Sequence, residues 1–146
     1  MGQVRHEVFI NGPREKVFAY IDDYRNVPEY MFGVGRFTPT TEQTSGLGSV
    51  FETAIKVGPK ELKATVKCTE WTRNELIRME SVSGFGADTC WSFADGPEPG
   101  TTVLLAEFGY TLPGGLAGKV LGGLMGPFAD QAVKHTENKV KAAVEG

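Results

Sequence analysis

Residues 112–146 read LPGGLAGKVLGGLMGPFADQAVKHTENKVKAAVEG, and this stretch decides which fold the chain adopts. Apolar residues recur in it at helical spacing, and charged residues fill most of the opposite side. Because proline removes a helical hydrogen bond, we expect a long C-terminal helix that is broken near Gly126-Pro127. The apolar stripe of this helix consists of Leu116, Val120, Leu121, Leu124, Met125, Phe128, Ala132, Val133, Val140 and Val144.

The chain before this helix alternates like a β-sheet. From Val34 to Leu112, apolar residues recur at a period of two between turn signals, which predicts about six strands joined as hairpins. Val4–Ile10 alternates in the same way and adds a seventh strand at the start. The turn signals are Ser45-Gly46, Gly58-Pro59, Arg73-Asn74, Gly84–Gly86 and Gly96–Gly100.

Two short helical segments follow the first strand. Val17, Phe18 and Ile21 fall at helical spacing, so we expect a helix that ends near Asp22–Asp23, then a second short turn over residues 24–30. One sheet cannot bury its apolar face alone, whereas a long helix laid across it can cover that face. The order therefore predicts an α+β helix-grip fold, with a seven-stranded curved antiparallel sheet around the last helix, in one domain over residues 1–146.

Charge and composition exclude several classes of function. The chain has 15 Lys and Arg against 18 Asp and Glu, a net charge of −3, so it lacks the basic face that nucleic acid requires. Prolines and glycines interrupt the most apolar stretch, residues 112–128, so we expect no stable membrane insertion. The N-terminus has no signal-peptide pattern, and Cys68 and Cys90 are expected to be free thiols. The cytoplasm is the expected location.

Three local patterns resemble a known superfamily. They are INGPREKVF at residues 10–18, DDYRNVPEYMFGV at 22–34 and GTTV at 100–103. In their order and spacing they resemble the START-like (SRPBCC) superfamily, which includes polyketide cyclase/dehydrase proteins, coenzyme Q-binding proteins and relatives of the birch-pollen allergen. The chain departs from that pattern at Tyr30, where the family often has tryptophan, and in its glycine-rich final helix.

This resemblance implies an internal cavity for a hydrophobic small molecule such as a lipid, an isoprenoid quinone or a polyketide. We expect a binding or carrier function with no cofactor and no metal site. Two alternatives stay open, a polyketide cyclase or aromatase and a protein-interaction module with a collapsed pocket. The sequence leaves ligand identity and the choice between monomer and homodimer open.

The residues expected to line the cavity come from inward-facing strand positions and from the last helix. A large apolar set on a curved sheet is also consistent with a dry core, so only part of it is expected to contact ligand. The candidates are Phe51, Ile55, Cys68, Trp91, Phe93 and Leu105 on strands, and Leu121, Leu124, Met125 and Phe128 on the helix.

His6 and Glu107 are the candidate catalytic pair. In this fold the first and last strands pair, so a carboxylate on the last strand can approach the inward-facing imidazole and form a general acid/base pair. A structural polar pair is the alternative. The cyclase hypothesis would add Arg36 or Tyr110 for proton transfer and enolate stabilisation.

The glycine-rich segment Gly114–Gly126 has two interpretations. Glycine costs a helix about 1 kcal/mol relative to alanine, so its presence needs a reason. Either glycine lets the helix lie close against the sheet, or the segment is a weak gate that opens for ligand. The apolar residues of this segment also suggest a transient membrane contact, although Lys119 alone is a small basic face for that.

Overall fold

A computed structural model describes residues 2–111 and 115–146, without the side chains of residues 115–117, 120 and 121. The elements follow in the expected order, with seven strands, two short helices and a 3-10 turn before one long helix. They are β1 (Gly2–Ile10), α1 (Arg14–Asp22), η1 (Tyr24–Asn26), α2 (Val27–Tyr30), β2 (Val34–Pro39), β3 (Val50–Val57), β4 (Lys60–Thr72), β5 (Leu76–Gly84), β6 (Gly86–Asp95), β7 (Thr102–Thr111) and α3 (Gly115–Glu145).

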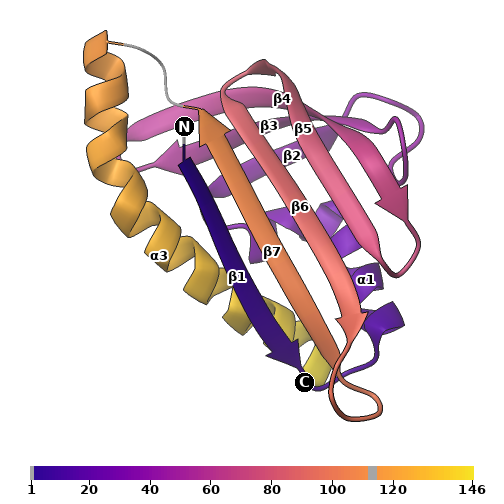
Figure 1. Ribbon diagram of the computed structural model, residues 1–146. Coiled ribbons are helices and arrows are strands. Elements are labelled where there is room, and N and C mark those ends of the chain that lie inside the picture. Colours follow the sequence, from indigo (N-terminus) through magenta and orange to yellow (C-terminus); the bar gives the residue numbers. More distant parts are fainter. Residues whose placement is uncertain (1, 112–114) are drawn as a thin grey trace.

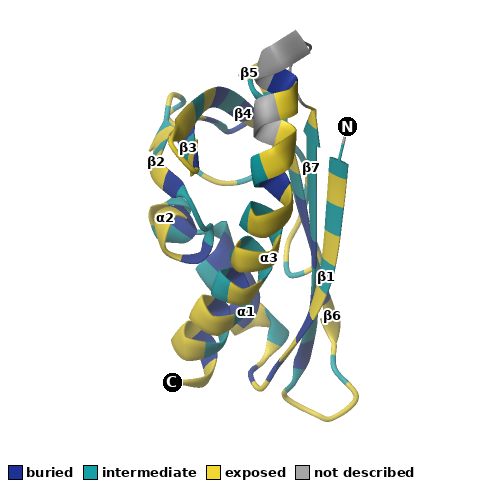
Figure 2. Ribbon diagram, turned by 90° about the vertical axis from the view of Figure 1, so that its left-hand side faces the viewer, coloured by how far each residue is buried: buried dark blue, intermediate teal, exposed yellow. Residues whose placement is uncertain are grey.

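The seven strands form one antiparallel sheet in the order β1-β7-β6-β5-β4-β3-β2. The sheet curls, and α3 runs along its open side (Figure 1). Viewed onto α3, the helix lies between β1 on one side and β2 with β3 on the other (Figure 2). This arrangement confirms the helix-grip fold, with α3 on the concave side of the sheet.

The predicted turns all connect neighbouring strands. Gly46, Gly58, Gly84 and Gly100 have positive φ angles in these turns, and so does Asn74. A positive φ favours glycine, with asparagine the best-tolerated substitute, so the local sequence specifies where each hairpin reverses.

The C-terminal half of α3 is anchored in the core. Val140 and Val144 are fully buried beside α1 and β1, where each contributes roughly 1.5–3 kcal/mol by leaving water. The Thr136 hydroxyl, also buried, donates to the backbone oxygen of Tyr30 at 2.6 Å and fixes α3 against α2. At the end of the helix, Lys16 Nζ donates to the Val144 carbonyl at 2.8 Å.

The N-terminal half of α3 continues the helix without the expected break. Pro127 lies inside a continuous helix and is exposed. A proline normally forces the residue before it out of helical geometry by contact with its Cβ, but that residue is Gly126, which has none. The expectation of a break at Gly126-Pro127 was therefore wrong. Glycine relieves the clash with the preceding residue, and the hydrogen bond that Pro127 cannot make does not by itself end the helix.

Close packing does not explain the exposed glycines of this half. A methyl group placed on Gly123 or Gly126 would meet no atom within 4 Å. Both positions have room for alanine, which is the better helix former. Glycine at these sites lowers helix stability without bringing α3 closer to the sheet.

His6 joins β1 to the anchored half of α3. Its Nε2 lies 2.9 Å from Glu137 Oε1, and both side chains are about one-third exposed. The hydrogen bond with His6, assisted by Lys141, holds the pKa of the Glu137 carboxyl below its usual value of 4.5. The ionised form of Glu137 therefore stabilises the folded state.

Glu137→Gln should lower stability near neutral pH by less than about 1 kcal/mol, because the pair is partly exposed to solvent. A carboxyl with a lowered folded-state pKa stabilises above its unfolded pKa, and this contribution disappears as the pH falls through the folded-state value. The difference between wild type and variant should therefore close below about pH 4.5. Urea denaturation at a series of pH values measures this, and a difference that persists at pH 2 would contradict the assignment.

Candidate functional site

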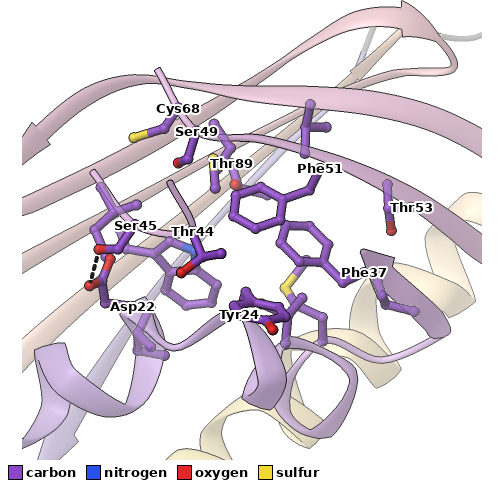
Figure 3. A pocket seen from close by; sticks show the side chains of 18 of the residues that line it. Asp22, Tyr24, Phe37, Thr44, Ser45, Ser49, Phe51, Thr53, Cys68 and Thr89 are labelled. Atoms are coloured by element: carbon purple, nitrogen blue, oxygen red, sulfur yellow. Dashed lines mark hydrogen bonds between the residues drawn. The ribbon is translucent and has the colours of Figure 1, made fainter. Parts of the chain in front are cut away.

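Two small chambers lie between the concave face of the sheet and the helices. The first, of about 70 Å³, lies between the middle of the sheet and the helical segment that follows β1 (Figure 3). The second, of about 100 Å³, lies between the sheet and α3. The two chambers meet at a set of residues that line both, namely Met31, Val34, Ile55, Ala87 and Thr89.

Aromatic side chains form the walls of the first chamber. The rings of Phe37 and Phe51 are stacked with their centroids 4.6 Å apart, and Tyr24 lies 5.9 Å from Phe51. Trp71 and Trp91 also line this chamber. Flat aromatic walls provide apolar area at a low cost in side-chain entropy, so they suit an apolar ligand with planar groups.

The buried hydroxyls of the first chamber are already hydrogen-bonded. Ser49 donates to the Gly46 carbonyl at 2.8 Å, and Thr53 donates to the Arg36 carbonyl at 2.9 Å. Burial, with a smaller contribution from the charge of Asp22, raises the pKa of the Cys68 thiol to about 11. Cys68 is therefore protonated at neutral pH and lines the chamber as a small apolar group.

The second chamber is enclosed by the middle of α3. Its lining includes Met125 and Phe128 from that helix, facing Phe108 on β7 and Phe85 in the β5–β6 turn. Gly33 lies beside it with a φ of +84°, and a methyl there would come within 2.9 Å of the Phe128 ring. Glycine is thus required where the α2–β2 turn passes under α3.

Six of the ten expected ligand-binding residues line a chamber. Trp91 also belongs to the core, where its ring meets Tyr30 edge-on at 5.4 Å. The six residues are Phe51, Ile55, Cys68, Trp91, Met125 and Phe128.

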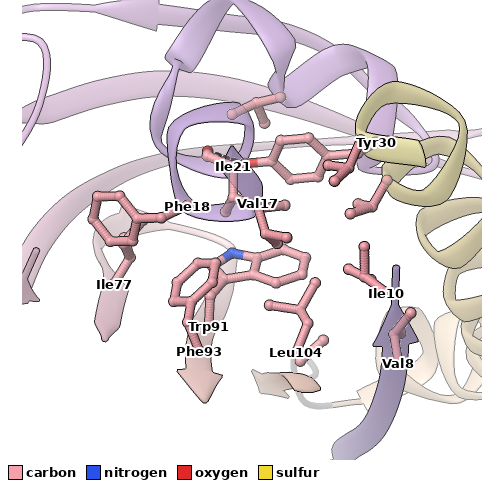
Figure 4. Close-up of a cluster of buried hydrophobic side chains, with 14 of the residues drawn as sticks. Val8, Ile10, Val17, Phe18, Ile21, Tyr30, Ile77, Trp91, Phe93 and Leu104 are labelled. Atoms are coloured by element: carbon pink, nitrogen blue, oxygen red, sulfur yellow. Dashed lines mark hydrogen bonds between the residues drawn. The ribbon is translucent and has the colours of Figure 1, made fainter. Parts of the chain in front are cut away.

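Three expected residues lie elsewhere. Phe93 packs against Phe18 at 5.1 Å in the core below α1 and lines neither chamber (Figure 4). Leu124 packs beside Gly58, and it lines neither chamber. Leu105 points to the convex face, because the buried residues of β7 are Thr102, Leu104 and Ala106. The side chain of Leu121 lies outside the described residues.

His6 and Glu107 do not come together. In the antiparallel pairing of β1 with β7, His6 lies opposite Ala106, whereas Glu107 lies opposite Arg5 on the convex face. His6 faces the concave side as expected, but its partner is Glu137. The expected pair was wrong because β7 has apolar residues on both faces, so alternation alone gave the wrong inward set. Of the two residues added in the cyclase hypothesis, Arg36 is exposed and Tyr110 lines the second chamber.

Sequence reasoning missed the polar end of the first chamber. Asp22, the last residue of α1, lies at this end. Its carboxylate accepts hydrogen bonds from Trp71 Nε1 at 3.0 Å and from Ser45 Oγ at 2.6 Å. These three residues are far apart in sequence, and nothing in the local pattern pairs them. The available signal was the family-like segment at residues 22–34, which begins at Asp22.

Comparisons with known proteins agree with this geometry. A family model described as polyketide cyclase/dehydrase and lipid transport matches residues 1–145. No curated protein matches the chain. Among the described residues, no helix has the length and apolar character needed to cross a membrane.

Several solved structures share the fold at low sequence identity. TTHA0849 from Thermus thermophilus is 23% identical, with a TM-score of 0.76 over 97% of this chain and 99% of that one. The Zhui aromatase/cyclase from Streptomyces sp. R1128 is 14% identical, with a TM-score of 0.76 over 99% and 93%. A START superfamily protein from Mycobacterium smegmatis is 16% identical, with a TM-score of 0.72 over 96% and 97%. The chain belongs to the polyketide cyclase/dehydrase and lipid transport family.

Proposed function

We propose that this protein binds and carries an apolar small molecule, of the lipid, isoprenoid quinone or polyketide class, without transforming it. Its family suggests a hydrophobic ligand-binding role. The observation that supports a carrier is the pair of adjoining chambers with aromatic and aliphatic walls. Burial of ligand there would supply affinity at about 25 cal/mol per Å² of apolar surface.

The cyclase alternative is less well supported. A cyclase needs a proton donor and acceptor that converge on the ligand. Within the described part of the chain, Glu107 is on the convex face, His6 is bound to Glu137, and the Cys68 thiol has a raised pKa. The protein-interaction alternative predicts a collapsed pocket, whereas this structure contains two chambers.

The size of the chambers implies that a ligand must widen them. Drug-sized ligands occupy pockets of about 300–1,000 Å³, and each chamber is well below that range. In the first part of α3, Met125 lines the second chamber, and Gly123 and Gly126 occupy positions with room for alanine. We therefore propose that this lid segment, residues 115–126, moves to admit the ligand.

The direct test of the carrier proposal is to purify the protein without detergent and extract it with organic solvent. Mass spectrometry of the extract should find an apolar molecule in stoichiometric amount, and native mass spectrometry should show the matching mass shift. A protein that carries nothing, and also fails to bind the neutral probe N-phenyl-1-naphthylamine, would contradict the proposal.

Ala87→Leu should weaken probe binding at least tenfold, because the larger side chain occupies the place where the chambers meet. Ala94→Leu is the matched control, since Ala94 lies on the same strand but is exposed and pairs with Val103 on the convex face. Fluorescence titration measures both affinities. Equal affinities for the two variants would place the binding site elsewhere.

Replacement of both Gly123 and Gly126 by alanine should stabilise α3 by up to roughly 2 kcal/mol, because neither methyl meets an obstacle. If the lid segment must move, the same change should also slow probe release several-fold in stopped-flow displacement. Asn138→Ala, at an exposed site in the anchored half, controls for helix propensity alone. Release that is slowed no more by the glycine variant than by the control would contradict a moving lid.

A further inference from the structure

The first chamber has one polar end, and Asp22 forms it. Asp22 is the last residue of α1 and is half-buried. It lines both the first chamber and an open polar groove on the outside of the protein, as do Tyr24, Thr44 and Ser45. These shared residues therefore form the partition between the apolar interior and solvent at the end of the molecule near α1.

The carboxylate of Asp22 is held in place from both sides of this partition. Trp71, which lines the chamber, donates its indole N–H to Oδ1 at 3.0 Å. Ser45, which is exposed, donates its hydroxyl to Oδ2 at 2.6 Å (Figure 3). Indole donors are fixed by packing, whereas a serine hydroxyl on a loop is easily exchanged for another donor.

The loop that carries Ser45 is connected mainly to itself. Within residues 40–49, the Gln43 amide donates to the carbonyls of Ser45 and Leu47, and Thr41 donates to the Gln43 carbonyl. In the described part of the chain, the Ser45–Asp22 bond is the hydrogen bond that ties residues 42–47 to α1. Breaking that one bond would leave the internal hydrogen bonds of the loop intact.

We propose that Asp22 is the polar anchor of the bound ligand and that the loop of residues 42–47 is a second entrance. This inference rests on the proposed carrier function and names the ligand class. When the loop moves, Oδ2 of Asp22 loses its donor, and an unpaired acceptor at the chamber wall is unfavourable. A hydroxyl group of the ligand replaces Ser45 as that donor, while the apolar body of the ligand occupies the first chamber.

The charges around this entrance select a neutral hydroxyl. Arg25 forms two hydrogen bonds with the carboxylate of Asp23, so its charge is compensated locally. Asp22 together with Glu15 then disfavours a ligand that ends in a carboxylate. On the other flank, Arg73 lies 5.5 Å above the Trp71 ring, where it compensates part of the negative charge of Asp22 and Glu15 and so weakens their attraction for a cation. The ligand class is therefore a planar or aliphatic apolar molecule that ends in an alcohol or a phenol.

The test compares three probes with one apolar body, namely naphthalene, 2-naphthol and 2-naphthoate, each measured by equilibrium dialysis at neutral pH. We expect 2-naphthol to bind roughly tenfold more tightly than naphthalene, the usual effect of one hydrogen bond to a charged acceptor. We expect 2-naphthoate to bind at least tenfold more weakly than 2-naphthol. Failure of all three to bind would contradict the carrier function itself, whereas equal affinity for the three would overturn only the role of Asp22.

Asp22→Ala should remove the preference, leaving 2-naphthol and naphthalene within about twofold of each other. Unchanged naphthalene affinity in this variant shows that the chamber is still folded. Glu15→Gln is the matched control, because it removes a groove carboxylate that makes no hydrogen bond to Ser45 or Trp71, and it should keep the preference for 2-naphthol. If Asp22→Ala loses naphthalene binding as well, Ser45→Ala replaces it as the test. That variant should keep the preference and speed association of 2-naphthol at least twofold, and a lost preference or an unchanged rate overturns the proposal.

Discussion

The structure depends on the burial of one apolar sheet face by one helix. All strands of the described residues belong to one curved sheet, so its concave face is covered by α3 together with the short segment α1–α2. The two halves of α3 meet this requirement unequally. Val140 and Val144 are buried, whereas Gly123 and Gly126 are exposed and a methyl group at either position would meet nothing within 4 Å outside the backbone of their own helix. The well-buried residues Val140 and Val144 therefore lie near one end of the helix, and the second chamber lies beside its middle.

This division explains how a small domain can be both stable and open to ligand. The core includes Val8, Ile10, Phe18 and Leu104 with the end of α3, and none of these residues lines a chamber. Other core residues do line the first chamber, so this chamber and the core share a wall. They are Ile21, Val27, Tyr30, Val34, Ile77 and Trp91. Low local stability at a binding site is a common physical requirement, because a ligand cannot enter a fully packed interior.

The sequence predicted the order of elements because several independent signals agreed. Turn residues with positive φ marked the hairpins, and the change of period after Pro113 marked the helix. The alternation of apolar residues did not identify which face of β7 points inward. The run Val103-Leu104-Leu105-Ala106 is apolar on both faces, so the inward set could not be chosen, and His6 was given the wrong partner.

For a related reason, the sequence predicted the apolar walls of the candidate site but not its polar end. Aromatic residues on strands indicated an apolar cavity, but Asp22, Ser45 and Trp71 meet through the tertiary fold and share no local spacing. Pro127 shows the same dependence on context, because the glycine before it relieves one of the clashes that make proline a helix breaker.

Native-state hydrogen exchange of α3 measures whether the two parts of this helix open at different free energies. We expect amides of residues 136–144 to exchange only through global unfolding, and those of residues 118–126 to exchange through an opening of much lower free energy. Saturation with N-phenyl-1-naphthylamine should protect residues 118–126 well beyond the amount by which it raises global stability. Equal opening free energies along the whole helix would contradict a division of α3 into an anchored half and a moving half.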